Sequence, residues 1–131
     1  MEQRHTAGEA IAALEMLQGI SRLGFPRGKH KEALEVAKLT LRLNRDPVVI
    51  AVDRARMDLF KQYGVEVGEG ANRQYAIPPV SQKEFQAAYN QIAEQQIDTR
   101  IEPLSLSALS CVEGISPAML VTLLPFLDEK N

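Results

Sequence analysis

The sequence predicts an α+β domain, in which an antiparallel helical hairpin is joined to a small antiparallel β-sheet and two further helices. Residues 30–64 carry the longest helical pattern, with apolar side chains at spacings of three and four. After Gly64 the pattern changes to alternation, which is typical of strands. Capping signals mark several helix starts. We expect one domain over residues 1–131, with a helical hairpin in 1–64 and strands plus two helices in 65–131.

The first helix is expected from Ala7 to Leu23. Thr6 and Glu9 form a T-x-x-E capping box, in which each side chain accepts a backbone N–H at the helix start. Glycine and proline in residues 24–28 then break the helix. Because this connection is short, the next helix should lie antiparallel beside the first.

The central stretch, residues 30–63, is either one kinked helix or two consecutive helices. Asp46 suits an N-cap and Pro47 suits the first helical position, so together they mark the bend. Gly64 should end the stretch, because glycine accepts the left-handed conformation that follows a last turn. The expected apolar stripe consists of Leu34, Ala37, Leu41, Val52, Ala55 and Leu59, with Met57 and Phe60 beside it.

The region after Gly64 predicts strands and a further helix. Residues 65–67 and 74–77 read as a β-hairpin around the turn residues of VGEGANR. A helix through about Gln95 is expected to begin at a second capping box, Ser81 with Glu84, with an apolar stripe of Phe85, Ala88, Tyr89 and Ile92.

The end of the chain predicts a third strand and a closing helix. Residues 97–101 alternate between apolar and polar, which favours a half-buried strand that pairs with the hairpin. Ser116 and Pro117 are the expected cap and first residue of the last helix, and Pro125 weakens its end.

Composition and charge are ordinary for a globular protein. Hydrophobic residues make up 45% and charged residues 24%, with a net charge of −2. The charge is uneven: residues 1–64 carry 11 basic and 8 acidic residues, whereas residues 65–131 carry 4 and 9. Such a bipolar chain can associate head to tail, although scattered surface charge is the more common explanation.

The cellular setting follows from the cysteine count and from hydropathy. The single cysteine, Cys111, fits a reducing compartment and lies in an apolar run, as a buried hydrophobe does. No signal-peptide pattern and no run of 18 apolar residues occur, so a cytoplasmic protein is expected.

The sequence offers few parts for catalysis or metal binding. His5 lies in a terminus expected to fray, and His30 lies in a basic loop, so neither belongs to a catalytic motif. One cysteine and two distant histidines do not make a zinc site. Asp53 and Asp58 are five apart on a helix and point to different sides. We therefore expect no enzyme activity, no metal and no cofactor.

The G-x-G in VGEGANR reads as a turn. It precedes an extended segment, whereas a phosphate-binding loop aims the amides of a helix N-terminus at the anion.

The candidate binding residues lie in a basic cluster at residues 22–31, RLGFPRGKHK. Its cations surround a helix–helix connection, which favours binding of an anion or nucleic acid there. Its aromatic ring can stack on a base. The alternative is a solvated loop, with the ring tucked under the hairpin and one arginine beside a helix C-terminus. The cluster comprises Arg22, Phe25, Arg27, Lys29, His30 and Lys31.

The central stretch also predicts a homo-oligomer, most simply a dimer. Apolar residues lie on more than one of its faces, and a chain this short has few other helices to cover them. The alternative is full burial within the monomer. The additional residues are Val36, Leu39, Leu43, Val48, Val49 and Ile50.

Three stretches resemble a small family of uncharacterised proteins encoded by tailed bacteriophages and their prophages. They are DRARMDLFKQYG, YAIPPVSQKEFQAAYNQIAEQQIDTRIEPLSL and GISPAMLVTLLPFL, within residues 53–128. The resemblance implies a phage protein that acts in the cytoplasm of the infected bacterium without enzymatic activity. It transfers no functional residue. Pro47 and the extra length of VGEGANR depart from the family pattern.

Two classes of function remain. The first is an interaction protein that binds a virion component or a host protein through helical surfaces. The second is a binder of nucleic acid, or of a small nucleotide signal, through the basic cluster. A net charge of −2 gives no long-range attraction to a polyanion, and about four phosphate contacts bind weakly at physiological salt, so the first is favoured. The weakness of so few contacts does not apply to a small nucleotide bound between the chains of an oligomer, because several chains can bring their cations to one ligand.

Overall fold

The computed structural model describes residues 5–72 and 74–128. This part of the chain is mostly helical with two very small sheets, so the α+β class is confirmed in its coarse form. The α-helices are α1 (Ala7–Leu23), α2 (His30–Arg45), α3 (Pro47–Tyr63), α4 (Pro79–Ala93), α5 (Leu106–Ser110) and α6 (Pro117–Leu123). The strands are β1 (Val65–Val67), β2 (Gln74–Ala76), β3 (Leu104–Ser105) and β4 (Leu127–Asp128), and short 3₁₀ turns cover Gly70–Asn72 and Leu124–Phe126.

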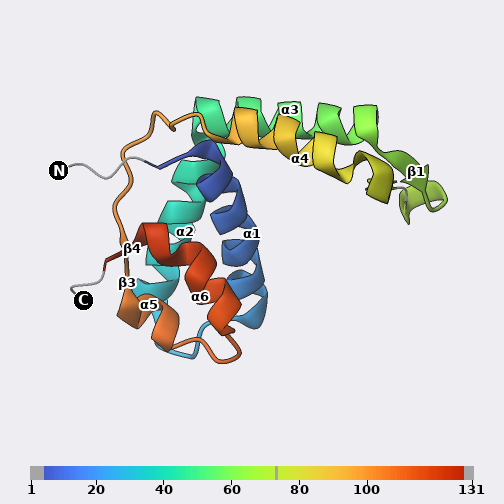
Figure 1. Cartoon of the computed structure of the whole chain (residues 1–131). Helices are drawn as coiled ribbons and strands as arrows, with labels where there is room; N and C mark the ends of the chain where they lie inside the picture. Colours follow the sequence, from blue (N-terminus) through green and yellow to red (C-terminus); the bar gives the residue numbers. More distant parts are fainter. Residues whose placement is uncertain (1–4, 73, 129–131) are drawn as a thin grey trace.

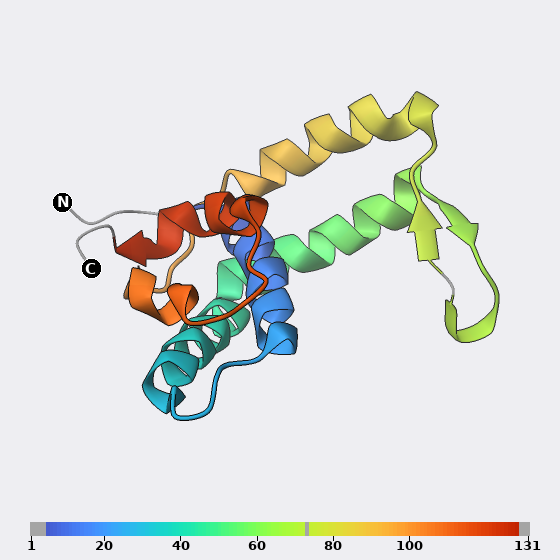
Figure 2. The same ribbon diagram turned by 90° about the horizontal axis from the view of Figure 1, so that it is seen from below.

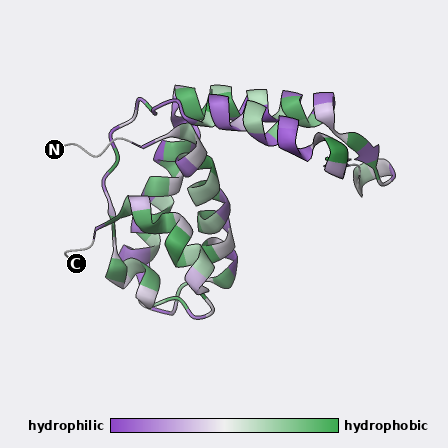
Figure 3. Cartoon of the chain, in the orientation of Figure 1, coloured by the Kyte–Doolittle hydropathy of each residue, from purple (hydrophilic) through white to green (hydrophobic). Residues whose placement is uncertain are grey.

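The helices form a body and a projecting arm. Helices α1, α2, α5 and α6 pack together as the body, while α3 and α4 leave it side by side and carry the β1–β2 hairpin at their far end (Figures 1 and 2). Hydrophobic positions are found along both helices of the arm as well as in the body (Figure 3). None of the helices in the described ranges is long and apolar enough to cross a lipid bilayer.

Helix α1 is the central element of the core, with the predicted bounds. The Thr6–Glu9 capping box is present: the Glu9 N–H donates to Thr6 Oγ1 at 3.2 Å, and the Thr6 N–H donates to Glu9 Oε1 at 3.0 Å. The helix packs against α2, α3, α4 and α6. Its buried residues are Ala7, Ala10, Ile11, Ala13, Leu14, Leu17 and Ile20.

The central stretch is two helices, and Asp46 separates them. Its side chain is fully buried at the start of α3, where Oδ1 accepts the N–H groups of Val48 at 2.8 Å and Val49 at 3.1 Å. Oδ2 accepts the N–H of Thr99 at 2.6 Å, from the segment that returns after α4. The Asp46 carboxylate thus separates α2 from α3, caps α3 and holds the chain that returns after α4.

The pKa of Asp46 reflects these contacts. Burial pushes the pKa upward, because the charged form loses water. Hydrogen bonds from Thr99, Val49 and Val48 outweigh burial, so the pKa lies below its ordinary value of 3.8. The carboxylate is therefore charged at neutral pH.

The predicted apolar stripe on α2 was wrong. The buried residues are Val36, Leu39 and Leu43, whereas Leu34 is 53% exposed and Leu41 is 48% exposed. Helix α2 carries two apolar stripes on opposite faces, and α1 and α5 cover one of them. The local pattern cannot distinguish these stripes, because both have helical spacing.

Gly64 ends α3, although not in the predicted left-handed conformation. Its φ of −92° is extended, because the chain runs directly into β1. A Cβ at this position would collide with the carbonyl oxygen of Phe60. Close approach of backbone, rather than a positive φ, therefore requires glycine here.

The predicted hairpin is confirmed, and the described residues 68–72 of VGEGANR lie between its strands. Strands β1 and β2 are antiparallel, with Val65 opposite Ala76 and Val67 opposite Gln74. Gly68 has a φ of 89°. Arg73, the last residue of VGEGANR, lies outside the described residues.

The prediction of a second capping box at Ser81 and Glu84 was wrong. Helix α4 begins at Pro79 with Pro78 as its N-cap, and no side chain caps it. Ser81 and Glu84 lie inside the helix. Pro79 starts the helix earlier because its fixed φ suits the first helical position and it has no N–H to leave unsatisfied.

The prediction of a third strand was also wrong. Residues 97–101 contain no strand and do not reach the hairpin, which lies at the far end of the arm (Figure 2). The chain next to them instead meets the N-terminal segment: Ala7 N–H donates to the Gln95 carbonyl at 2.7 Å, and Ile97 N–H donates to the His5 carbonyl at 3.0 Å. The second sheet is parallel, with Leu104 beside Leu127 and Ser105 beside Asp128.

The sequence predicted that His5 lies in a frayed terminus, and this prediction was wrong. Its side chain is buried and stacks on Phe126, with ring centroids 4.3 Å apart. Burial lowers the pKa of His5 from its ordinary value of 6.5, although the charge of Glu9 partly offsets this shift. The neutral imidazole thus packs the N-terminal segment against the C-terminal 3₁₀ turn.

The closing helix matches the prediction. Ser116 caps α6, since its Oγ accepts the Met119 N–H at 3.2 Å, and Pro117 is the first residue. The helix ends at Leu123 and continues as a 3₁₀ turn that contains Pro125. Cys111 packs against the core but is half-buried rather than fully buried.

We expect Asp46→Ala to destabilise the fold by about 2–4 kcal/mol, because α3 loses its cap and the Thr99 N–H loses its acceptor. Urea denaturation measures the free energy of unfolding. Asp98→Ala is the matched control, since Asp98 is an exposed carboxylate next to Thr99, and should cost less than about 0.5 kcal/mol. Equal effects of the two substitutions would contradict the role of Asp46.

Stability should fall as pH drops below about 6.5, because the unfolded chain then binds a proton at His5 that the fold disfavours. The contribution is present above pH 6.5 and is lost toward the lowered folded pKa. Urea midpoints at pH 7.5 and 5.5 should differ in the unmodified chain and much less in His5→Phe, which keeps a ring on Phe126. His30→Gln is the control, because His30 is exposed. An undiminished pH dependence in His5→Phe would refute this assignment.

Candidate interaction site

The predicted basic cluster lies at the end of the body remote from the arm (Figure 1). Its residues occupy the end of α1, the connection and the start of α2. Arg22, Arg27, Lys29, His30 and Lys31 are all exposed, and none forms an ion pair with a described residue.

Phe25 is the exception within the basic cluster. Its ring is half-buried and packs against the hydrophobic core. This placement matches the interpretation of a ring tucked under the helical hairpin. The structure thus gathers the predicted cations on one surface, while the aromatic side chain serves the connection.

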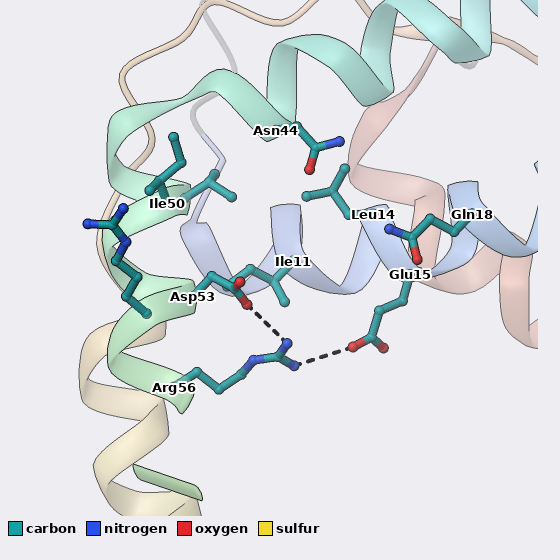
Figure 4. Close-up of a pocket in the computed structure, with 10 residues that line it drawn as sticks. Ile11, Leu14, Glu15, Gln18, Asn44, Ile50, Asp53 and Arg56 are labelled. Atoms are coloured by element: carbon teal, nitrogen blue, oxygen red, sulfur yellow. Dashed lines mark hydrogen bonds and ion pairs between the residues drawn. The ribbon is translucent and has the colours of Figure 1, made fainter. Parts of the chain in front are cut away.

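A groove that sequence reasoning missed lies where the arm joins the body. Its larger hollow has a volume of about 410 Å³. Residues from α1, the end of α2 and the first half of α3 line it, and most of them are shown in Figure 4: Ile11, Leu14, Glu15, Gln18, Asn44, Val49, Ile50, Asp53, Arg54 and Arg56.

A second hollow of about 220 Å³ continues the groove toward α4. It shares Ile11, Glu15 and Arg56 with the first hollow. The remaining lining residues are Ala12, Phe60, Phe85, Gln86 and Tyr89. We call the two hollows together the arm-root groove.

Arg56 stands between the two hollows and links α1 to α3. Its Nη2 lies 3.0 Å from Asp53 Oδ1, and its Nη1 lies 3.3 Å from Glu15 Oε1 (Figure 4). Its Nε is buried and makes no hydrogen bond. The side chains of Glu15 and Asp53 are 59% and 49% exposed, so each pair contributes at most about 1 kcal/mol. The main effect of Arg56 is therefore to position the carboxylates of Glu15 and Asp53 in the groove, and it adds little to the stability of the fold.

Tyr89 places a phenol beside this charged group. Burial raises its pKa above the ordinary value of 10.0. The charge of Arg56 lowers the pKa in part, while Glu15 and Asp53 raise it. The phenol is therefore protonated at neutral pH and can donate a hydrogen bond into the groove.

Aromatic contacts hold the two arm helices together. The ring centroids of Phe60 and Phe85 are 4.8 Å apart, and Phe85 also lies 6.4 Å from both Tyr63 and Tyr89. All four rings are half-buried, and no residue of α4 is buried. The arm thus has a seam rather than a core of its own.

The groove offers chemical groups that can bind a ligand. It combines an apolar floor with two arginines, two carboxylates and amide groups, which are recognition groups at protein surfaces. Within residues 5–72 and 74–128, no group of three His, Cys, Asp or Glu side chains is placed to hold a metal ion. Absence of enzyme activity stays a prediction.

No local signal pointed to the arm-root groove. Glu15 and Arg56 are 41 residues apart on different helices, so only their packing brings them together. Asp53, which the sequence placed on a different side of the helix from Asp58, is half-buried beside Arg56. Asp58 is exposed.

Comparisons with known proteins do not add to this description. No family model, no curated protein and no solved structure matches the chain.

Proposed function

We propose that this chain is a non-enzymatic interaction protein of a tailed bacteriophage, which binds a virion component or a host protein in the cytoplasm of the infected cell. The observation that carries the proposal is the projecting α3–α4 arm, whose helix α4 has no buried residue. A helix pair with so little burial of its own has its surface available to a partner.

The distribution of apolar side chains supports this proposal. Ile50, Met57 and Val80 are exposed on the arm, at 41%, 45% and 86%. Ile50 also borders the arm-root groove. Apolar side chains next to oriented charges are the usual composition of a protein–protein contact. The stretches that resemble the phage family include the second half of α3 and all of α4.

The second candidate function is binding of nucleic acid or of a small nucleotide signal at the basic cluster. Four exposed cations, Arg22, Arg27, Lys29 and Lys31, have no ion pairs to described residues and favour it. It ranks second because Phe25 packs against the core and leaves the cluster without a free aromatic surface for a base.

Capture from infected cells tests the proposed function. The tagged chain should retain a phage or host protein, and Ile50→Asp should abolish that capture, because it places a charge at the apolar edge of the groove. Val121→Asp, on the exposed side of α6, is the matched control and should leave capture unchanged. The double variant Arg27→Ala with Lys29→Ala should also retain the protein. A co-purifying nucleotide that is lost in this double variant would reverse the ranking of the two functions.

The homodimer expected from the sequence remains part of the proposal, now with the arm as its surface. Light scattering at micromolar concentration should give about twice the 14.5 kDa of one chain. Met57→Glu should halve this mass, because Met57 is exposed on the arm, while Val121→Glu should leave it unchanged. A mass of one chain for the unmodified protein would rule out the dimer.

A further inference from the structure

The outward face of α2 carries an apolar stripe that no other part of the described structure covers. Leu34 and Leu41 are about half-exposed, opposite the buried face formed by Val36, Leu39 and Leu43. Because the two leucines are seven residues apart, they lie on one side of the helix about 10 Å from each other. Ala37 lies between them and is also exposed.

Cations follow the leucines at the same spacing. Lys31, Lys38 and Arg45 are exposed and successive members are seven residues apart, so they form a parallel row beside the leucines. None of the three forms an ion pair with a described residue. We call the leucines and this row together the outer stripe of α2.

The acidic residues of α2 do not neutralise the outer stripe. Glu35 accepts from the Ser105 N–H at 2.9 Å and from the Ser105 hydroxyl at 3.0 Å, so it is turned toward β3. Glu32 precedes Val36 by four residues and lies near the buried face. Arg42 stands at the edge of the stripe, 3.9 Å from Glu102, which partly balances its charge.

This pattern fits a helix with acidic flanks. Apolar residues repeated every seven positions, with one charge beside each, are the arrangement by which a helix recognises another helix. The charge on the partner must be negative at the flanking positions. A second copy of α2 does not fit, because it would face the three cations with identical cations.

Nucleic acid fits the outer stripe less well. Three phosphate contacts would give a salt slope of only about −3, and the leucines in the middle would gain nothing from phosphates. An apolar partner surface, by contrast, covers the leucines and removes them from water.

From this combination we infer that the outer stripe of α2 is a docking site for an acidic amphipathic helix of a partner protein. The inference rests on the proposed function and names one surface and one partner chemistry for it. The leucines would anchor the partner helix, and Lys31, Lys38 and Arg45 would select it by charge.

Synthetic helical peptides test the inference on the full chain. One peptide has three heptads with Leu at a and d and Glu at e and g, and the matched peptide has Lys at e and g. Fluorescence anisotropy should show at least about tenfold tighter binding of the acidic peptide. The double variant Leu34→Ala with Leu41→Ala should weaken its binding about tenfold or more. Lys38→Glu with Arg45→Glu should reverse the preference between the peptides.

The controls separate this surface from other exposed apolar residues. Leu120→Ala with Val121→Ala removes two exposed side chains of α6 and should leave peptide binding unchanged. Circular dichroism checks that every variant is folded. A DNA duplex of about 20 base pairs serves as the competing polyanion.

Three outcomes would overturn the inference. They are equal binding of the acidic and basic peptides, binding that survives loss of both leucines, and DNA binding tighter than that of the acidic peptide. If none of these variants alters peptide binding while Ile50-dependent capture of a protein persists, the inference about the outer stripe is wrong and the proposed function stands. If the acidic peptide binds as expected and that capture is absent, the outer stripe stands and the arm is not the partner surface.

Discussion

The architecture depends on one buried carboxylate, that of Asp46. Three backbone N–H groups, from Val48, Val49 and Thr99, share its two oxygens. Without a charged acceptor, the first turn of α3 and the returning chain would both hold unsatisfied donors in a buried place. Because Val48 and Val49 are near neighbours of Asp46 while Thr99 is 53 residues away from it, the same carboxylate defines a local boundary and a long-range contact.

The root of the arm is held a second time, by the segment before and at the start of α1. His5 and Ala7 exchange backbone hydrogen bonds with residues that follow α4. Gly8 allows this approach, since a Cβ there would lie 2.9 Å from the Ala93 Cβ. Farther along the arm, contacts of the half-buried ring of Phe85 with its aromatic neighbours join α3 to α4. Order at the root and sparse burial beyond it are properties expected of an element that meets a partner.

Three surfaces stand out in the described part of the chain: the arm-root groove, the basic cluster and the outer stripe of α2. The basic cluster and the outer stripe are continuous, since Lys31 belongs to both. Their shared charge explains why the N-terminal half is basic although the chain as a whole is slightly acidic. Charge alone would favour any polyanion, whereas exposed leucines between the cations favour a protein. The arm-root groove differs again, because Arg56, one of its two arginines, is already paired with two carboxylates.

The sequence by itself determined the features whose physics is local. Thr6 with Glu9, Asp46 with Pro47, and Ser116 with Pro117 act within one helical turn, so their positions alone predicted three helix starts. The β1–β2 hairpin was predictable for the same reason, since a short turn joins its strands. Tertiary structure decided the features that depend on distant neighbours. Burial of Val36 rather than Leu34 depends on where α1 and α5 lie. The failure of residues 97–101 to form a strand depends on Asp46 and on the N-terminal segment, which take up backbone groups that a ladder would have used. The pairing of Arg56 with Glu15 likewise exists only because α1 and α3 meet, and no spacing along one helix encodes a contact between two.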